Sequence, residues 1–582
     1  MTHFIKPLSF LVILLLAATA GGSAVRAQDA LGDGGAGPGD GEALIDNIVV
    51  VDASADELVP EDELPAAVFL RIEYDEGDLY GGDVSERLTD LFEFYDARLY
   101  EPIWVTETGP NQRARALIDA LIDAERHALY PGNYDIGTIA LLLGVTTPTA
   151  LADFEMRLSK ALLDYGRDLS AGRVEPSEVD SELAIFPEGP SAAELLTGVL
   201  NSPEPAGYLA SLAPASPNYA RLQQKLDEYR AAAAMGEWTK VPEDEVLKPG
   251  MNQARVPVLR QRLAQSGHYD PASAPPPAPG AETVYDDALV AAVELFQQRH
   301  GLDVDGVVGP GTLAALNVPL ADRVRQMELN MERRRWMEDD LGENYVFVNL
   351  ADFELKVVKG PKTVHTARVV IGKPYHRTPV FSETMKYIEI NPYWNVPRSI
   401  AGNELLPKLK NDPGSLKRDG IRIFSSYASD AYEVDPWSVN WHGYSAKGFP
   451  FRLRQDSGDG NALGRIKFMF PNRFNVYLHD TPSKSLFARA VRSFSHGCVR
   501  VQNPRDFGAV LLAEQGWSRE EIDGVVASGE RKVVNLERPI RVHITYLTAW
   551  VNKDGSVHFR DDIYGRDETL AKALERSLRG SV

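Results

Sequence analysis

The sequence has almost no cysteine: Cys498 is the single one among 582 residues. One thiol cannot form an internal disulfide, so disulfide bridges within the chain are excluded. Such a cysteine is either a small buried hydrophobic residue or a reactive thiol. The residues that flank Cys498 in sequence distinguish a buried hydrophobic residue from a reactive thiol.

Basic residues are also fewer than acidic ones. Lys and Arg total 61 against 83 Asp and Glu, which gives a formal net charge of −22. Non-specific binding to nucleic acid or to anionic lipid requires a basic surface. We therefore expect no nucleic-acid partner.

Long apolar runs are confined to the N-terminal segment. Lys6 precedes a mainly apolar run from Leu8 to Ala20, and the small residues Val25 and Ala27 follow. This pattern is typical of a signal peptide over residues 1–27, so we predict an exported protein, with an uncleaved anchor as the alternative. The run is shorter than the roughly 20 apolar residues of a spanning helix. No later run reaches that length, so we expect no stable membrane span.

Composition and periodicity divide the remaining chain. Its length predicts about three or four folding units of roughly 150 residues each. Residues 28–83 begin rich in Gly, Asp and Ala and become acidic, which predicts a disordered or acidic tether. Residues 84–240 carry apolar side chains at three- and four-residue steps, which predicts a helical scaffold domain. We assign these apolar stripes to core packing.

A further helical pattern covers residues 251–318 and ends in a turn-dense stretch. Gly306 and Gly309 there suit turns with positive φ. The string F-Q-x-x-H-G-L-x-x-D-G-x-x-G-P-x-T-L starts at Phe296. It resembles the small three-helix peptidoglycan-binding domain, so this module is expected to bind the cell wall.

From Asn344 the pattern changes to alternating apolar and polar residues in short runs separated by turns. This predicts a mainly β domain, sandwich or barrel-like, over residues 344–549. The last segment, 550–582, is predicted as a C-terminal tail that returns to helix. The fold class is therefore α+β and multidomain.

The segment that carries chemistry joins two of these strands. Alternation from Val476 places His479 near the end of one strand, and a loop then leads to Ser495-His496-Gly497-Cys498 at the start of the next. A thiol with a pKa near roughly 8.5 is mostly protonated at neutral pH, and an imidazole that takes its proton creates the attacking thiolate. Backbone N–H groups at Gly497 and Cys498 are expected to face the oxyanion that forms.

This segment resembles the catalytic motif of the L,D-transpeptidase family, in which a histidine precedes a Ser-His-Gly-Cys sequence. Three further strings fit the large periplasmic branch of that family, at residues 390–397, 461–468 and 479–484. The resemblance implies a periplasmic enzyme in which Cys498 attacks a donor stem peptide, D-Ala leaves, and an acceptor stem forms a 3→3 cross-link. It implies no cofactor, and it makes other cell-wall synthesis proteins candidate partners.

The remaining site residues are predicted with less defined roles. His496 is expected either to support the thiolate or only to shape the turn. Five residues are candidates for substrate binding. They are Tyr477, Ser495, Arg500, Asn391 and Trp394. Of these, Arg500 is a candidate to hold a substrate carboxylate, with an ion pair at a strand edge as the alternative. For Trp394, core packing is the favoured alternative. The stretch 408–459 interrupts the strands and is predicted to be a lid over the cleft.

Other functions were weighed against this one. His479, His496 and Cys498 form a ligand set that zinc accepts, but their spacing matches no zinc motif and a fourth ligand is not evident, so no metal site is predicted. An L,D-carboxypeptidase would share the acyl-enzyme and use water as acceptor. A non-catalytic wall-binding protein would depend on the helical module alone. The intact Cys, His and Gly set argues against the last.

Overall fold

The computed structural model describes residues 86–579, so the predicted signal peptide (1–27) and tether (28–83) lie outside the described residues. The chain separates into two compact units. Among the described residues, the first comprises 86–123, 130–165 and 191–210, and the second comprises 124–129, 166–190 and 211–579. Within residues 86–579, no helix combines the length and the apolar character that crossing a membrane requires.

The first unit is helical, as predicted. Its described elements are α3 (Glu86–Asp96), β1 (Val105–Thr106), β2 (Gly109–Pro110), α4 (Gln112–Ile122), η2 (Pro131–Tyr134), α5 (Ile136–Leu141), most of α6 (Pro148–Ala171), α8 (Ala192–Asn201) and α9 (Pro205–Ser211). Among its described residues, Glu155 is a carboxylate with no exposed surface. The Tyr95 hydroxyl donates to it at 2.7 Å, and the amides of Ile103 and Trp104 donate as well, the second at 2.9 Å.

Replacing Glu155 with alanine should strongly destabilise this unit. Buried donors left without an acceptor cost about 1–3 kcal/mol each, and three donors meet at this carboxylate. We expect urea denaturation followed by circular dichroism to show a clear loss in the free energy of unfolding. Exposed Glu93→Ala on α3 is the matched control and should change little. Equal stability of the two variants would contradict the prediction.

The three-helix module lies in the second unit and agrees with the predicted pattern. Its helices are α11 (Val256–Gln265), α12 (Asp287–Arg299) and α13 (Pro310–Leu316), packed around a shared apolar core. Gln297 organises the turn that follows α12, because its side-chain oxygen accepts from the amides of Asp305 and Gly306 at 3.1 and 2.9 Å. Gly306 has the predicted positive φ of 66°, but the prediction for Gly309 was wrong, because Gly309 caps α13 with a φ of −86°.

The predicted β domain is a closed barrel. Its principal strands are β3 (Asn344–Asn349), β4 (Glu354–Lys359), β5 (Lys362–Gly372), β6 (Phe381–Ile390), β10 (Ile466–Met469), β11 (Leu478–His479), β12 (Ser493–Ser495), β13 (Val499–Val501) and β14 (Lys532–Thr545). The sheet order is β12-β5-β13-β11-β10-β6-β14-β3-β4, and a further pairing of β4 with β5 closes it. The helices α18 (Pro504–Leu512) and α19 (Arg519–Ser528) contribute to the same apolar core.

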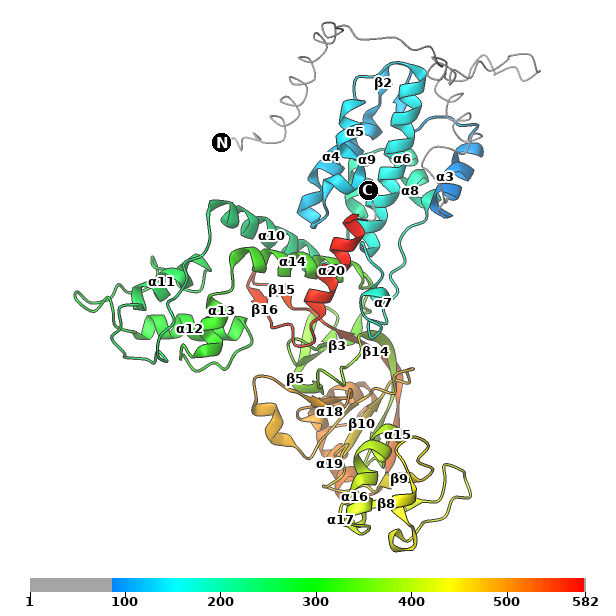
Figure 1. Cartoon of the computed structure of the whole chain (residues 1–582), viewed down its shortest axis with the longest axis vertical. Helices are drawn as coiled ribbons and strands as arrows, with labels where there is room; N and C mark the ends of the chain where they lie inside the picture. The colour runs from blue at the N-terminus through cyan, green and yellow to red at the C-terminus, as the bar shows by residue number, and fades with distance from the viewer. Residues whose placement is uncertain (1–85, 580–582) are drawn as a thin grey trace, which may run out of the picture. The chain divides into compact units, whose positions relative to one another are not determined.

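A small subdomain interrupts the barrel between β6 and β10, and we call residues 394–455 the cap. It contains β7 (Trp394–Asn395), α15 (Arg398–Ile400), the π-helix η3 (Ala401–Leu405), α16 (Leu406–Asn411), α17 (Ser415–Arg418), β8 (Ile421–Phe424), η4 (Pro436–Ser438), η5 (Trp441–Gly443) and β9 (Arg452–Gln455). These elements, yellow-green to yellow in Figure 1, have an apolar core of their own. The cap therefore starts earlier than the predicted insertion at 408–459.

Four helices and a β-hairpin complete the second unit outside the barrel and the three-helix module. They are α7 (Pro176–Val179), α10 (Pro217–Met235), α14 (Leu320–Arg335) and α20 (Arg566–Arg579), with the hairpin of β15 (Ala549–Val551) and β16 (Val557–Phe559). Leu222 and Leu226 of α10 share a core with Met327 and Met331 of α14. Thus α10, which the sequence placed in the scaffold domain, belongs to the second unit.

The predicted tail is an integrated part of the second unit. Arg566 at the start of α20 is almost fully buried, and its guanidinium pairs with Asp180 at 3.0 Å and with Glu182 at 3.2 Å. Arg377, between β5 and β6, pairs with the same two carboxylates at 3.3 and 2.8 Å. The segment after α7, the barrel and the C-terminal helix are thereby tied together.

Candidate functional site

The site forms where two neighbouring strands run side by side. Strands β11 and β13 pair in parallel, with Leu478 opposite Val499 and His479 opposite Arg500. Leu478 and Val499 are buried in the barrel core. Because side chains alternate along a strand, His479 and Arg500 project from the outer face, and so does Cys498. His479 thus lies at the end of one strand and Cys498 directly before the next, and the catalytic roles of the two residues stay a prediction.

The turn that presents Cys498 is braced internally. Gly497 has a φ of 108°, which favours glycine. The Ser495 hydroxyl donates to the Cys498 carbonyl at 2.5 Å and accepts from the Gly497 amide at 3.1 Å, while the Thr378 hydroxyl donates to the Gly497 carbonyl at 2.9 Å. Two predictions were therefore wrong. Ser495 is a buried turn brace rather than a substrate contact, and the Gly497 amide points at Ser495 rather than at a reacting oxyanion.

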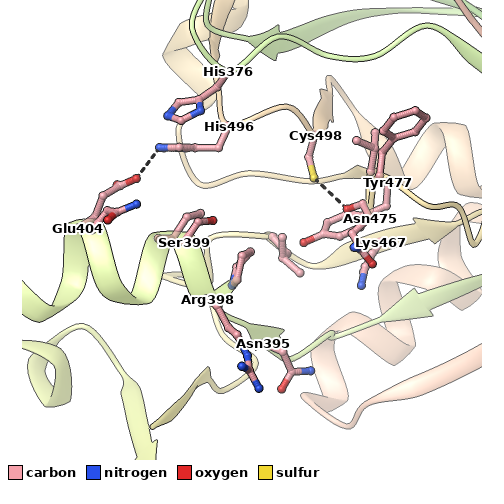
Figure 2. A pocket seen from close by; sticks show the side chains of 16 residues that line it. His376, Asn395, Arg398, Ser399, Glu404, Lys467, Asn475, Tyr477, His496 and Cys498 are labelled. Atoms are coloured by element: carbon pink, nitrogen blue, oxygen red, sulfur yellow. Dashed lines mark hydrogen bonds and ion pairs between the residues drawn. The ribbon is translucent and has the colours of Figure 1, made fainter. Parts of the chain in front are cut away.

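A cavity of about 570 Å³ opens in front of Cys498. One wall comes from the barrel and the opposite wall from the first part of the cap, as Figure 2 shows. The lining residues are His376, Asn395, Pro397, Arg398, Ser399, Ile400, Asn403, Glu404, Leu463, Lys467, Phe474, Asn475, Val476, Tyr477, His496 and Cys498. Its volume lies within the range of small-molecule and cofactor sites.

The thiol is half-buried at the base of this cavity. Its Sγ lies 3.9 Å from the carbonyl oxygen of Asn475, the contact drawn in Figure 2. Burial raises the pKa of Cys498, whereas hydrogen bonding to Tyr477 and the positive charges of Lys467 and Arg500 oppose the rise. The surroundings thus favour a thiol at rest and contain the groups that would stabilise a thiolate.

His479 is nearly fully buried, and its Nδ1 atom hydrogen-bonds the carbonyl oxygen of Asp480. Burial, reinforced by the charge of Arg500, lowers the pKa of His479 to about 3, so the imidazole is neutral near pH 7. Its ring meets the Tyr477 ring edge-on at a centroid distance of 5.6 Å. The structure therefore brings His479 and Cys498 to the same face but not into direct hydrogen-bond contact.

Asp480 holds the backbone that orients His479, a role that the sequence analysis missed. Its carboxylate accepts from the amides of Arg465 at 2.9 Å and of Thr481 at 2.7 Å, and it also pairs with Lys484. Since the Asp480 carbonyl holds Nδ1 of His479, this carboxylate fixes the imidazole indirectly. Gly464 lies in the family string at residues 461–468 and Asp480 in the one at 479–484, so the resemblance could have marked both residues as part of the site.

Gly464→Ala is expected to disrupt this arrangement. Gly464 has a φ of 60°, and an added Cβ would lie 2.3 Å from the Asp480 carboxyl carbon. We expect a loss of roughly 1–3 kcal/mol in the free energy of unfolding, because strained φ and steric overlap combine. Urea denaturation measures it. Gly460→Ala is the control, since a Cβ there meets no atom within 4 Å. Equal stability of both variants would refute the prediction.

His496 faces the cap rather than the thiol. Its Nε2 atom pairs with Glu404 of η3 at 2.8 Å, as drawn in Figure 2, and its ring lies 5.0 Å from that of His376. Burial lowers the pKa of His496, and the charge of Glu404 opposes this shift. The residue thus links the cysteine turn to the cap.

The other predicted residues divide between the cavity and the interior. Tyr477 lines the cavity, as expected of a substrate-binding residue. Asn391 does not: it is fully buried with a φ of 52°, and its amide donates to the carbonyls of Val525 and Glu530 at 2.8 and 3.0 Å. Trp394 packs against the cap core instead. Arg500 lies beside the cavity residues without lining the cavity, so its role as a carboxylate ligand stays a prediction.

Sequence reasoning missed most of the cavity wall. Lys467 and Asn475 contribute from the barrel, and Arg398 and Glu404 contribute from the cap. Arg398 and Glu404 lie before the predicted lid at 408–459. Lys467 lies in the family string at residues 461–468, and Asn475 directly precedes the strand that begins at Val476, but neither residue was assigned a role. Across residues 86–579, no three His, Cys, Asp or Glu side chains converge in a way that could hold a metal ion.

The part of the chain that carries the cavity is a β-barrel with an inserted cap. Comparison with known families identifies this domain and the two that precede it. A model described as the L,D-transpeptidase catalytic domain matches residues 343–511. A scaffold domain model matches residues 89–226, and one described as "Putative peptidoglycan binding domain" matches residues 252–316. The chain therefore carries an L,D-transpeptidase catalytic domain together with a scaffold domain and a peptidoglycan-binding domain.

Individual relatives give a narrower match. A Haemophilus influenzae protein named "Putative L,D-transpeptidase" is 34% identical over 246 residues, which cover 42% of this chain and 49% of that protein. The chain thus matches about half the length of this relative.

Two solved L,D-transpeptidase structures were also found. The one from Xylanimonas cellulosilytica is 18% identical, covering 52% of this chain and 98% of that chain, with a TM-score of 0.17. The one from Stackebrandtia nassauensis is 13% identical, covering 55% and 99%, with a TM-score of 0.20.

Proposed function

We propose that this protein is a peptidoglycan L,D-transpeptidase that forms 3→3 cross-links between stem peptides. The observation that carries the proposal is Cys498, which lies in the cavity of an L,D-transpeptidase catalytic domain beside a buried, neutral His479. A thiol on a cavity wall, with groups nearby that stabilise its ionised form, meets the first requirement for acyl transfer, because the thiolate is the nucleophile.

The reaction has two half-steps. The sulfur of Cys498 attacks the carbonyl between the third stem residue and the terminal D-Ala, the C–N bond breaks, and D-Ala leaves with a proton on its amine. The side-chain amine of a second stem then attacks the thioester, a new amide bond forms, and the thiol regains a proton. These steps need a proton acceptor and donor but no redox change, so no cofactor is required.

His479 is the proposed acceptor and donor of that proton. An imidazole that is neutral near pH 7 has one unprotonated ring nitrogen that can take a proton. The backbone carbonyl of Asp480 holds Nδ1, and the backbone of Leu463 also hydrogen-bonds the ring. At rest Sγ contacts Asn475, so a rotation of the Cys498 side chain must precede proton transfer. Catalytic contacts often form only when substrate is bound.

The cap is proposed to act as a lid over the bound stem peptide. Its contact with the cysteine turn includes the hydrogen-bonded pair of Glu404 and His496, whose side chains are 45% and 32% exposed. Pairs this exposed contribute about 1 kcal/mol or less, so the link is weak enough to break during binding. Limited proteolysis with and without stem peptide tests the lid. Cleavage of the cap at equal rates in both cases would contradict it.

Binding to the wall and export are two further proposals. The three-helix module is proposed to hold the enzyme on peptidoglycan, and residues 1–27 are proposed to direct it to the periplasm. Co-sedimentation with purified sacculi tests the first, and cell fractionation tests the second. Protein left in the supernatant, or retained in the cytoplasm, would overturn the respective proposal.

Intact-mass spectrometry with a disaccharide-tetrapeptide tests the function itself. A covalent acyl adduct together with a dimer that carries a 3→3 bond would support the transpeptidase. An adduct with tripeptide but no dimer would overturn it in favour of an L,D-carboxypeptidase. If folded protein gave neither adduct nor product, a non-catalytic wall-binding role would take its place.

A further inference from the structure

Within residues 86–579, the hydrogen bonds of the Cys498 sulfur go to Tyr477 and to the Asn475 carbonyl, and none of them involves a charged group. Sγ of Cys498 contacts the Asn475 carbonyl oxygen, an acceptor that repels negative charge, and His479 is neutral and held by another carbonyl. Burial of the thiol further disfavours the thiolate. A nucleophilic cysteine here needs positive charge from elsewhere in the site.

Lys467 supplies that charge from the next strand. It lies on β10, where it pairs in register with His479 of β11 on one side and Glu389 of β6 on the other. Its neighbours Ile466 and Phe468 are buried in the barrel core, so Lys467 projects from the same outer face as His479. It lines the cavity together with Cys498.

The ammonium of Lys467 is not committed to a carboxylate. Among residues 86–579, none places a carboxylate oxygen within 4.0 Å of its Nζ atom, and Glu389 is paired with Arg531 instead. Nζ lies 4.0 Å from the centroid of the Tyr477 ring, on which it rests as a cation on an aromatic face. In Figure 2 Lys467 lies next to Asn475 and Tyr477, below Cys498.

We propose that Lys467 is the electrostatic partner of the Cys498 thiolate, a positioning residue that holds the sulfur in its nucleophilic form. The proposal rests on the proposed role of Cys498 as nucleophile. Tyr477 lies between the two, with its ring against the ammonium and a hydrogen bond to the sulfur.

Other charged groups around the site also influence Cys498 or Lys467, so the experiment must separate their effects from that of the lysine charge. Arg500 is a second cation on the same face, and its effect on the thiol is smaller than that of Lys467. Burial lowers the pKa of Lys467, the negative charges of Glu389 and of the Cys498 thiolate oppose this shift, and Arg531 adds to it. On the cap side, Glu404 is occupied by His496.

The pH dependence of alkylation by iodoacetamide tests the proposal on the full-length protein. Because Cys498 is the single cysteine of the chain, every alkylation event reports on this sulfur. We expect Lys467→Met to raise the midpoint of the rate–pH profile by about one unit, as loss of a nearby opposite charge does. Near neutral pH the rate should then fall roughly tenfold. Lys467→Arg, which keeps the charge, should restore the midpoint.

Lys386→Met is the matched control, since Lys386 is an exposed lysine on β6 outside the cavity. An unchanged midpoint in Lys467→Met, or an equal shift in Lys386→Met, would overturn the proposal. Lys467→Gln replaces the methionine variant if the latter does not fold. Alkylation requires no wall substrate, so a shifted midpoint in an enzyme that makes no cross-links would refute the proposed function and leave this inference standing.

Discussion

Cys498→Ala should abolish both the acyl adduct and the cross-linked product while leaving the fold unchanged. The substitution removes the only thiol of the chain and puts a small residue in place of another small residue. Since the side chain lies half-buried at a cavity wall rather than in the barrel core, little packing is lost. Intact-mass spectrometry with a disaccharide-tetrapeptide reads the adduct, and chromatography of the products reads the cross-link.

The control for this variant is its thermal unfolding, which should match that of the wild type. An adduct that still forms on Cys498→Ala would place the acyl group on another residue and end the cysteine mechanism. Cys498→Ser offers a second comparison, because a hydroxyl keeps the size of the side chain but not the acidity of the thiol.

His479→Ala is expected to have the second large effect, a loss in the rate of acylation. Loss of a general base slows the step it assists by roughly 10²–10⁴-fold, so we expect acylation to slow by that order. Single-turnover acylation followed by mass spectrometry measures the rate directly. His479→Gln separates the two roles of the ring, because glutamine keeps a donor for the Asp480 carbonyl but cannot accept the proton.

Near-normal acylation in both His479 variants would remove this residue from the mechanism. A slow alanine variant with a normal glutamine variant would make His479 a structural support for the turn. Both outcomes differ from the Lys467 result, since the lysine acts on thiol ionisation and the histidine on proton transfer.

The strand–loop–strand arrangement of the site was predictable because it is local. Alternation through Val476 and the short run at Val499 set both strands, and their pairing follows once they lie side by side. The helical periodicity of the three-helix module was equally clear in sequence. Closure of the barrel by β4 and β5 was not, because strand order depends on contacts between distant segments.

Residues whose partners are distant in sequence account for most of the errors. Asn391 resembled a cleft residue after a strand, yet its amide bonds backbone carbonyls more than 130 positions later. Ser495 lay in the motif, but only its geometry shows that its hydroxyl spans the turn. The cap begins at Trp394 rather than at 408, because its first strand pairs with β9 across the whole insertion. None of these contacts leaves a periodic signal.

The ion pairs of Arg566 with Asp180 and Glu182 limit where this chain can be cut or recombined. A fragment bounded by the family match at residues 343–511 would omit β14, which pairs with both β6 and β3, together with Arg566 itself. The segment that carries Asp180 and Glu182 lies on the other side of the three-helix module in sequence. Exchange of the catalytic segment between homologues should therefore preserve the fold only if both flanking segments are transferred with it.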